Sequence, residues 1–356
     1  MSIQNFSVPR KDIAQNICLG FVGSMLGGDS GGNLTMGHII ADKFNQAGYP
    51  IVLASSKNNK VIRLFDMLFT ILSRHRDIDI LIIQVYSGLS FIYVDICSWL
   101  GKFLGLPMIF HVHGGNIPNL VERKPCWARQ VFNRADKFVA PSEYLAKSIN
   151  KLGFSCITIP NIIELSKYPY RSIGFAKPKL IWLRSFHSIY NPTLAVKVVI
   201  ELNKMGQKVL LTMVGPDKGD GSLDLTLETA QEYGVSQQIS IIKGIPKSQV
   251  PYELSKSDIF INTTNIDNTP VSVIEAMACG LCIVSTNVGG IPYLLEDGVD
   301  ALLVQPDDAV AMAKAVKKIL NEPDLADKLS ANARKKAEQF DWENILPRWE
   351  KILKVL

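Results

Sequence analysis

Short apolar runs alternate with segments of helical periodicity along most of the chain. The runs are rich in Val, Ile and Leu, as is usual for strands buried on both faces of a parallel sheet. In chain order they are Ile17–Val22, Ile51–Ala54, Ile78–Val85, Met108–Val112, Lys137–Ala140, Cys156–Ile159, Leu180–Leu183, Val209–Val214, Ile239–Ile242, Asp258–Asn262, Leu281–Ser285 and Ala301–Val304. The pattern predicts an α/β protein with two Rossmann-like, doubly wound parallel sheets.

A segment without clean periodicity separates the two groups of strands. Residues 160–178 contain three prolines and several polar residues, which indicates a hinge. We expect a first domain over residues 1–165, a second over 166–338 and a last helix over 339–356. The carboxyl ends of the two sheets are expected to face each other across a cleft.

The composition is that of an ordinary folded protein. Of 356 residues, 47% are hydrophobic and 20% are charged, which suits two domains at roughly 150 residues each. The net charge of +5 is compatible with diphosphate ligands or an anionic membrane and is too small to indicate a nucleic-acid partner.

Cysteine usage and hydropathy point to a cytoplasmic chain. Six cysteines are scattered without a disulfide framework, and no leader-like segment precedes the first strand. Cys279 and Cys282 fall at a helix end and in an apolar strand, which favours core packing over metal binding. No apolar run reaches the roughly 18 residues that span a bilayer, so any contact with the inner face of a membrane is expected to be peripheral.

Residues 262–280 predict an anion site. A strand ends at Asn262, Thr269 is a suitable N-cap, Pro270 suits the first helical position and Gly280 suits a helix end. A strand that leads directly into a helix leaves the first N–H groups and the positive dipole end available to a phosphate. The chain is therefore expected to bind a phosphorylated ligand.

Two carboxylates flank this helix start, Asp267 before it and Glu275 within it, with seven residues between them. This spacing resembles the Glu, seven residues, Glu element of glycosyltransferase family 4, a family of retaining sugar transferases with the GT-B fold. The resemblance extends over nearly the whole chain, and it implies that the last helix, over residues 339–356, crosses back to pack on the first domain. It implies that Glu275 holds the ribose of a nucleotide and that Asp267 contacts the donor sugar.

The loop between the two carboxylates departs from the family pattern. The family usually follows the first acid with Gly-aromatic-Gly, whereas this chain has Asn268, Thr269 and Pro270, followed by Val271. The resemblance places these residues at the donor diphosphate, where Thr269 still offers a hydroxyl and an N–H.

Glycines and histidines mark the edge of the first predicted sheet. Gly31 and Gly32 belong to a glycine-rich turn after the first strand, and such a turn lets a ligand approach the backbone. The resemblance places them at the donor diphosphate or the acceptor. His111 and His113 point to the same side if they share a strand. His113 matches the family histidine beside the donor sugar, while His111 stays open between the cleft and the core.

Arg184 follows a predicted strand and resembles the family arginine that grips the diphosphate, which a guanidinium does in a bidentate manner. The lysine that the family normally adds a few residues later is absent. Asn191 and Pro192 instead suit the cap and the first residue of the next helix. Lys218 is either a replacement for the lysine or a solvated loop residue. Further N–H donors are expected from Asn287, Gly289 and Gly290.

Basic residues lie among apolar ones in two predicted helices of the first half, over residues 61–76 and 119–134. They are Arg63, Arg74, Arg76, Arg123, Lys124, Arg129 and Arg134. Because acceptors bind to the first half in the family, the resemblance allows a lipid-linked saccharide acceptor at a membrane surface. The alternative is a pair of ordinary amphipathic helices that face their own sheet.

The expected function is transfer of a hexose-type sugar from a nucleotide-diphosphate sugar, with UDP as the first guess, to a hydroxyl acceptor in cell-surface polysaccharide or glycolipid synthesis. The family retains configuration with the departing phosphate as base, so the resemblance assigns catalysis to His113, Asp267 and Arg184. No metal or other cofactor is expected, because fixed protein charge takes its place. The alternatives are a non-catalytic nucleotide-sugar-binding module and a sugar-nucleotide epimerase of the same fold.

Overall fold

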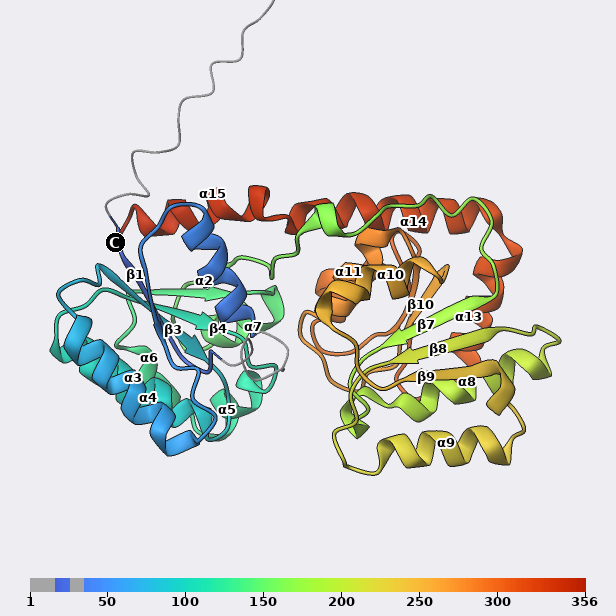
Figure 1. Cartoon of the computed structure of the whole chain (residues 1–356), viewed down its shortest axis with the longest axis horizontal. Helices are drawn as coiled ribbons and strands as arrows, with labels where there is room; N and C mark the ends of the chain where they lie inside the picture. Colours follow the sequence, from blue (N-terminus) through green and yellow to red (C-terminus); the bar gives the residue numbers. More distant parts are fainter. Residues whose placement is uncertain (1–16, 26–34) are drawn as a thin grey trace, which may run out of the picture. The chain divides into compact units, whose positions relative to one another are not determined.

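The computed structural model describes residues 17–25 and 35–356, and these form two compact units (Figure 1). The first unit contains the described residues up to Pro141, together with Leu145–Ile159 and Arg348–Leu356. The second contains Ser142–Tyr144 and Pro160–Pro347. The predicted domain limits at residues 165 and 338 stay a prediction.

The first unit is built on a parallel sheet with the order β2-β1-β3-β4-β5-β6. Its strands are β1 (Leu19–Val22), β2 (Ile51–Ala54), β3 (Ile80–Val85), β4 (Met108–Val112), β5 (Lys137–Ala140) and β6 (Cys156–Thr158). The helices that alternate with them are α2 (Met36–Gln46), α3 (Lys60–Arg74), α4 (Ser90–Phe103), α5 (Ile117–Arg123), α6 (Pro125–Phe132) and α7 (Glu143–Asn150). Helix α2 covers one face of the sheet, and α3 and α4 cover the other (Figure 1).

The second unit repeats this design with the strand order β12-β11-β10-β7-β8-β9, again parallel throughout. Its strands are β7 (Lys179–Leu183), β8 (Leu210–Val214), β9 (Ile239–Ile242), β10 (Ile259–Asn262), β11 (Cys282–Thr286) and β12 (Leu302–Val304). The helices are α8 (Pro192–Lys204), α9 (Ser222–Glu232), α10 (Val250–Ser255), α11 (Val271–Cys279), α12 (Ile291–Leu294), α13 (Ala309–Asn321) and α14 (Pro323–Ala337), followed by α15 (Trp342–Leu353), which both units share.

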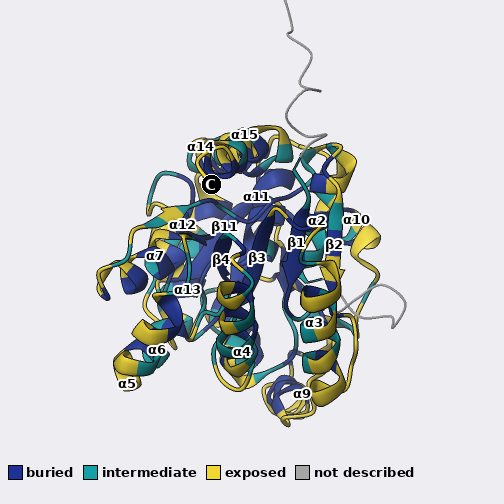
Figure 2. Ribbon diagram, turned by 90° about the vertical axis from the view of Figure 1, so that its left-hand side faces the viewer, coloured by how far each residue is buried: buried dark blue, intermediate teal, exposed yellow. Residues whose placement is uncertain are grey.

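Two hydrophobic clusters cover the two faces of the second sheet. One gathers buried residues of α8, α9 and α13, and the other gathers those of α10, α11, α12 and α14. The buried strands run between layers of helices that are exposed on their outer sides (Figure 2). The prediction of parallel sheets covered on both faces is confirmed, and each predicted strand is present with ends that differ by at most two residues.

One predicted helix is divided. The segment 119–134 forms α5 and α6, which meet at Lys124, where the backbone leaves helical geometry (φ −135°, ψ 56°). Pro125 explains the break, because a proline disfavours helical geometry in the residue before it and suits the first position of a new helix.

The last helix connects the second unit with the first. Residues from Arg348 onward belong to the first unit, where the buried ring of Trp349 meets Phe44 edge-on at 5.9 Å and His111 at 5.1 Å. Within residues 17–25 and 35–356, no helix is long and apolar enough to cross a membrane.

Candidate active site

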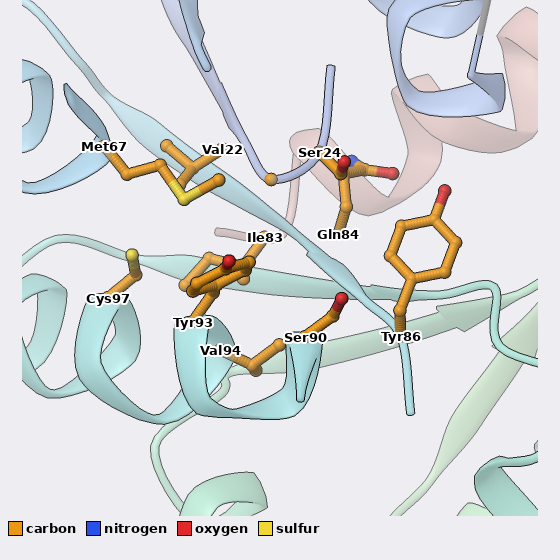
Figure 3. Close-up of a pocket in the computed structure, with 11 residues that line it drawn as sticks. Val22, Ser24, Met67, Ile83, Gln84, Tyr86, Ser90, Tyr93, Val94 and Cys97 are labelled. Carbon is orange, nitrogen blue, oxygen red and sulfur yellow. The ribbon is translucent and has the colours of Figure 1, made fainter. Parts of the chain in front are cut away.

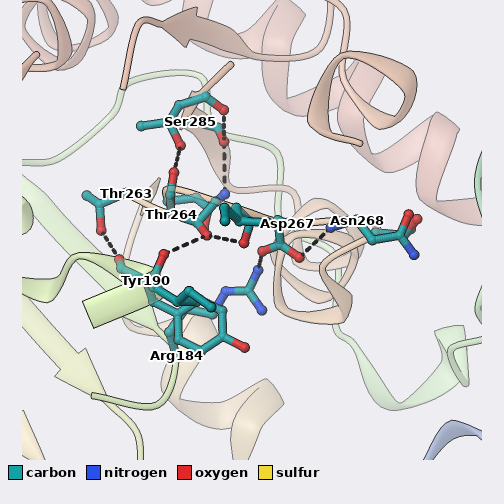
Figure 4. A network of polar contacts seen from close by, with 12 residues as sticks. Arg184, Tyr190, Thr263, Thr264, Asp267, Asn268 and Ser285 are labelled. Atoms are coloured by element: carbon teal, nitrogen blue, oxygen red, sulfur yellow. Dashed lines mark hydrogen bonds and ion pairs between the residues drawn. The ribbon is translucent and has the colours of Figure 1, made fainter. Parts of the chain in front are cut away.

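The carboxyl edge of the second sheet brings Arg184 and Asp267 together (Figure 4). Arg184 directly follows β7, and Asp267 lies in the loop between β10 and α11; β7 and β10 are neighbouring parallel strands. The Arg184 Nη2 donates to Asp267 Oδ2, and the two side chains are 13% and 12% exposed. The structure thus brings these two predicted site residues together, and their roles in donor binding stay a prediction.

Arg184 keeps donor capacity beyond this ion pair. Its guanidinium lies 4.7 Å from the ring centre of Tyr190, and its buried Nε has no hydrogen-bond partner. Burial lowers the pKa of Arg184 to about 10, so the group stays charged at neutral pH. A buried cation with an unused donor is suited to an anionic ligand.

The loop that carries Asp267 is held firmly from behind. Thr286 Oγ1 donates to the carbonyl of Thr264 at 2.6 Å, and the N–H of Gly290 donates to the carbonyl of Asp267 at 2.9 Å. A Cβ at Gly290 would lie 1.9 Å from the Asn268 carbonyl oxygen, so only glycine permits this approach. Figure 4 shows Thr264, Asp267 and Asn268 of this loop with their neighbouring polar contacts.

These contacts correct one expectation. Gly290 and Asn287 were expected to offer N–H groups to a phosphate, but they donate to Asp267 and to the Val304 carbonyl. The glycine at 290 is needed for close packing against the loop, and the two N–H groups are already used.

Helix α11 begins one residue later than predicted. Its first residue is Val271, Pro270 takes the cap position, and no side chain caps the helix. The hydroxyl of the predicted cap, Thr269, is buried without a partner, as is that of Ser272 in the first turn. The first N–H groups of a helix have no acceptor within it. This helix start therefore presents unsatisfied N–H and hydroxyl donors a few residues after Asp267, the partner of Arg184.

Asn268 contacts a neighbouring loop instead of pointing into open space. Its Oδ1 accepts from Ser142 Oγ, and Asn161 Nδ2 donates to the carbonyl of Thr269 at 3.4 Å. The sequence analysis did not anticipate Ser142 or Asn161, since both lie more than a hundred residues before the loop.

Glu275 is buried on α11 and is 2% exposed. Its Oε1 accepts from Tyr168 Oη and from Lys247 Nζ. Burial and the adjacent Glu275 carboxylate raise the pKa of Tyr168, so the phenol is a proton donor. Sequence reasoning missed Tyr168 and Lys247, and no local motif marks either residue.

Lys218 and Asn191 lie on loops near the ends of β8 and β7. Lys218 is exposed, and its main-chain N–H donates to the Phe186 carbonyl at 3.1 Å. Within the described part of the chain, Lys247 and not Lys218 contacts one of the predicted donor-binding carboxylates. Asn191 does precede Pro192 at the start of α8, but its Nδ2 donates to Asp307 Oδ1 at 2.6 Å instead of capping that helix.

The carboxyl edge of the first sheet carries His111 and His113, whose ring centres are 3.9 Å apart. His113 Nε2 lies 2.6 Å from Gln84 Oε1 and 3.1 Å from His111 Nδ1, and Tyr86 stacks on its ring. The two histidines point to the same side, as predicted. Gln84, on the neighbouring strand β3, was missed. The predicted residues Gly31 and Gly32 lie outside the described residues.

Burial keeps these histidines uncharged. It lowers the pKa of His113 to about 3, and burial with the adjacent His113 lowers the pKa of His111. Both rings are therefore neutral at physiological pH, where His113 can form hydrogen bonds with hydroxyl groups without repelling or attracting a net charge.

A small pocket opens beside this group, between β1, β3, α3 and α4 (Figure 3). Ser24, Ser90 and Tyr93 line it with hydroxyl groups, and Met67 forms part of its apolar wall. Gln84 also lines it, and its buried Nε2 has no partner. The lining of this small pocket thus combines hydroxyl and amide groups with an apolar wall.

No group of three or more His, Cys, Asp or Glu side chains that could hold a metal ion lies among the described residues. Asp77 and Asp79 have the Asp-x-Asp spacing, but they precede β3, at the amino end of the first sheet. Asp77 pairs with Arg74 at 2.6 Å, and Asp79 accepts from the Cys18 N–H at 2.7 Å.

The two parallel six-stranded sheets define the class: a protein of the GT-B fold. Residues 175–336 match the model described as "Glycosyl transferases group 1", and residues 40–167 match "Glycosyltransferase Family 4". The chain belongs to glycosyltransferase family 4.

Solved structures share the fold over nearly the whole chain. HepE from Anabaena, in complex with UDP and glucose, has a TM-score of 0.75 and 14% identity, and the match covers 96% of this chain and all of that one. Sucrose-phosphate synthase from Thermosynechococcus elongatus has a TM-score of 0.77 and 16% identity over 95% of this chain and 98% of its own. At such identities the likeness shows the fold alone.

Curated relatives are matched over part of their length. A D-inositol 3-phosphate glycosyltransferase from Rhodococcus erythropolis is 22% identical over 61% of this chain and 53% of its own. An α-1,4-N-acetyl-D-galactosaminyltransferase from Campylobacter jejuni, named for an undecaprenol-linked saccharide, is 26% identical over 46% of this chain and 44% of its own. The chain thus spans about half the length of these relatives.

Proposed function

We propose that the protein transfers a hexose-type sugar, with retention of configuration, from UDP-sugar to a hydroxyl acceptor. One observation carries this proposal: the buried Arg184 and the start of α11 meet at one sheet edge, and both have unused donors. A departing diphosphate requires positive potential that is already in place, and a helix start beside a guanidinium supplies it.

In this proposal the Arg184–Asp267 pair rearranges when donor binds. The diphosphate competes with Asp267 for the guanidinium, and Asp267 is then available to a hydroxyl of the sugar. Thr269 Oγ1 and Ser272 Oγ are buried without hydrogen-bond partners, which costs free energy. In the proposed complex both hydroxyls donate to phosphate oxygens, which removes this cost. Val271 contributes its N–H at the beginning of the helix.

Glu275 and His113 are assigned to the two ends of the donor. A buried carboxylate such as Glu275 is a strong acceptor for the vicinal hydroxyls of ribose, with Tyr168 and Lys247 fixing its position. Neutral His113 is assigned to a sugar hydroxyl, because an uncharged ring beside Gln84 suits a polar and uncharged group.

The acceptor is proposed to be a lipid-linked saccharide used in cell-surface polysaccharide or glycolipid synthesis, reached at the inner face of a membrane. The name of the Campylobacter relative, which includes an undecaprenol carrier, supports this choice. HepE, with UDP and glucose in its structure, supports a UDP-linked hexose. Transfer is proposed to need no metal ion.

Donor turnover tests the proposal. Purified protein is incubated with a panel of nucleotide sugars, with and without detergent extracts that contain lipid-linked saccharides, and nucleoside diphosphate release is measured. Release from UDP-hexoses, increased by acceptor and abolished in Arg184→Ala, is expected. Stoichiometric binding of donor without release would overturn the enzyme assignment in favour of a nucleotide-sugar-binding module.

A further inference from the structure

Helices α3 and α4 expose apolar side chains on the side that faces away from their sheet. On α3 these are Val61, Ile62, Phe65, Phe69 and Leu72; Phe69 is 71% exposed. The opposite side of α3 packs inward through Met67 and Ile71, which are fully buried. The outer stripe recurs at helical spacing, so α3 has a second apolar face that its own fold does not use.

Helix α4 repeats this arrangement beside α3. Ile92, Trp99 and Phe103 lie on its outer side, Leu89 precedes its first turn, and Phe103 is 75% exposed. Trp99 and Phe103 stack on each other at 5.8 Å. We call these nine residues of the two helices the α3/α4 apolar face.

The two helices form one continuous surface. Tyr93 Oη donates to the Lys60 carbonyl at 3.1 Å and joins their amino-terminal ends. Figure 2 shows them next to each other with exposed residues along their length. Contiguous exposed apolar surface on this scale marks a site of interaction with a protein or a membrane.

Charge distinguishes between these two partners. The exposed side chains of Lys60, Arg76 and Lys102 lie at the ends of the two helices, and Arg123, Lys124 and Arg129 lie on α5 and α6. Helix α6 adjoins α4, because Trp127 Nε1 donates to Asp95 Oδ2 at 2.7 Å.

Few opposing charges share this side. The exposed Asp77 pairs with Arg74, Asp66 is half-buried and Glu122 is exposed on α5. Aromatic and aliphatic residues bordered by an excess of lysine and arginine are the composition of helices that lie in the interface of an anionic bilayer.

Two of the arginines that the sequence analysis considered for a membrane surface do not face outward. Arg63 is 7% exposed and donates to Ser24 Oγ and the Lys57 carbonyl. Arg134 pairs with Asp95 at 2.6 Å. Both hold the fold together, so the membrane-facing charge comes from other residues.

We propose that the α3/α4 apolar face docks on an anionic lipid bilayer. Phe65, Phe69, Trp99 and Phe103 insert at the level of the headgroups, and the surrounding cations contact lipid phosphates. The pocket of Figure 3 lies on the opposite side of these helices, between them and the sheet. This inference identifies the surface behind the membrane location in the proposed function, but docking itself requires no transfer.

Vesicle binding by the full chain tests the docking. Co-sedimentation is measured with pure phosphatidylcholine vesicles and with vesicles containing about one third phosphatidylglycerol, without any nucleotide sugar. Binding is expected for the anionic vesicles and should weaken as salt is raised. Phe69→Gln combined with Phe103→Gln should lower the partition coefficient at least about tenfold, because two large apolar side chains no longer leave water.

A matched control uses Phe175→Gln combined with Leu225→Gln, since these residues of the second unit are also well exposed (68% and 54%). This variant should bind vesicles as the parent does, and both variants should retain the parental melting temperature and UDP binding. Absence of binding to anionic vesicles, or equal losses in the two variants, would overturn the docking. A parental dimer that only the face variant converts to a monomer would assign the face to a second copy instead.

The outcome is separable from that of the proposed function. Vesicle binding without donor turnover would leave the face intact and remove the transferase assignment. Donor turnover without vesicle binding would keep the transferase assignment and exclude membrane docking through the α3/α4 apolar face.

Discussion

The carboxyl edges of the two sheets carry different chemistry. At the first, His111 and Gln84 are buried, His113 is partly buried, and all three are uncharged. At the second, Arg184 and Asp267 form an ion pair beside a helix start with unused donors. Parallel strands place loops at this edge in both units, so the difference comes from the side chains and the helix start that follow the strands. One edge suits neutral hydroxyl groups, and the other suits a diphosphate.

Removal of Arg184 is expected to cause the largest loss of ligand affinity at the carboxyl edge of the second sheet. Arg184→Ala is expected to weaken binding of a nucleoside diphosphate by about 1.5–3 kcal/mol, since the hydrogen bond it loses is to a charged group. Nucleoside binding should change little. Calorimetric titration of UDP and uridine measures the contrast.

Arg171→Ala is a matched control, because Arg171 also pairs with an aspartate of the second unit, Asp258 at 2.5 Å. Its carbonyl lies next to Gly280, at the far end of α11, so UDP affinity should persist. Equal losses for UDP and uridine in Arg184→Ala would remove Arg184 from the diphosphate site.

Asp267 tests whether the charged edge also handles the sugar. Asp is one methylene shorter than the Glu usual in the family, so its carboxylate reaches the sugar only from a loop held close to it. We expect Asp267→Asn to lower transfer by at least roughly tenfold, about 1.4 kcal/mol of transition-state stabilisation, with nucleotide affinity within about threefold.

Steady-state kinetics with UDP titration separates these two effects. Transfer by Asp267→Asn at the parental rate would show that the carboxylate does not contact the sugar. Asp217→Asn, in the exposed loop after β8, is the control and should leave both quantities unchanged.

Glu275 should affect the nucleoside end of the donor. Glu275→Gln is expected to weaken both UDP and uridine by a similar factor, about tenfold, because its proposed partner is the ribose present in both. Thermal shift with each ligand measures this. Tyr168→Phe, which keeps the carboxylate and removes one of its donors, should produce a smaller loss; a loss confined to UDP in Glu275→Gln would contradict the ribose assignment.

The parts that were predictable from sequence are those set by local patterns. Buried strands such as β10 appear as apolar runs, and Gly280 ends α11 at φ +79° as a left-handed helix end requires. The partners Gln84, Tyr168 and Lys247 come from distant segments without a motif, so only the folded chain reveals them. The sequence also did not reveal which way the basic side chains of a helix point. Arg63 and Arg134 turn inward, where Arg63 donates to a backbone carbonyl and Arg134 pairs with a carboxylate.

The uncharged state of His113, at the carboxyl edge of the first sheet, can be tested through the pH dependence of stability. The pKa of His113 in the folded protein, about 3, lies below the ordinary value of 6.5. The unfolded chain therefore binds more protons between these values, and stability falls as pH is lowered through that window. The slope is of order 1 kcal/mol per pH unit for one such histidine.

Denaturant unfolding at a series of pH values from about 6.5 to 5 measures this slope. His113→Gln should reduce it, since one group that binds protons only when unfolded is removed. An unchanged slope in the variant would show that His113 is already protonated in the folded protein, and the two edges would then differ less than proposed.

Chelation should have the smallest effect of all. In the proposed site the leaving diphosphate is stabilised by the Arg184 guanidinium and the amino end of α11, which belong to the protein and cannot be extracted by EDTA. The transfer rate in excess EDTA is therefore expected to stay within about twofold of the untreated rate, as fixed and preorganised charge implies. Rates are compared before chelation, after chelation and after addition of magnesium or manganese. Loss of transfer that either cation restores would mean that the site at the edge of the second sheet is incomplete without a metal ion. The contrast between the two sheet edges would then no longer rest on protein groups alone.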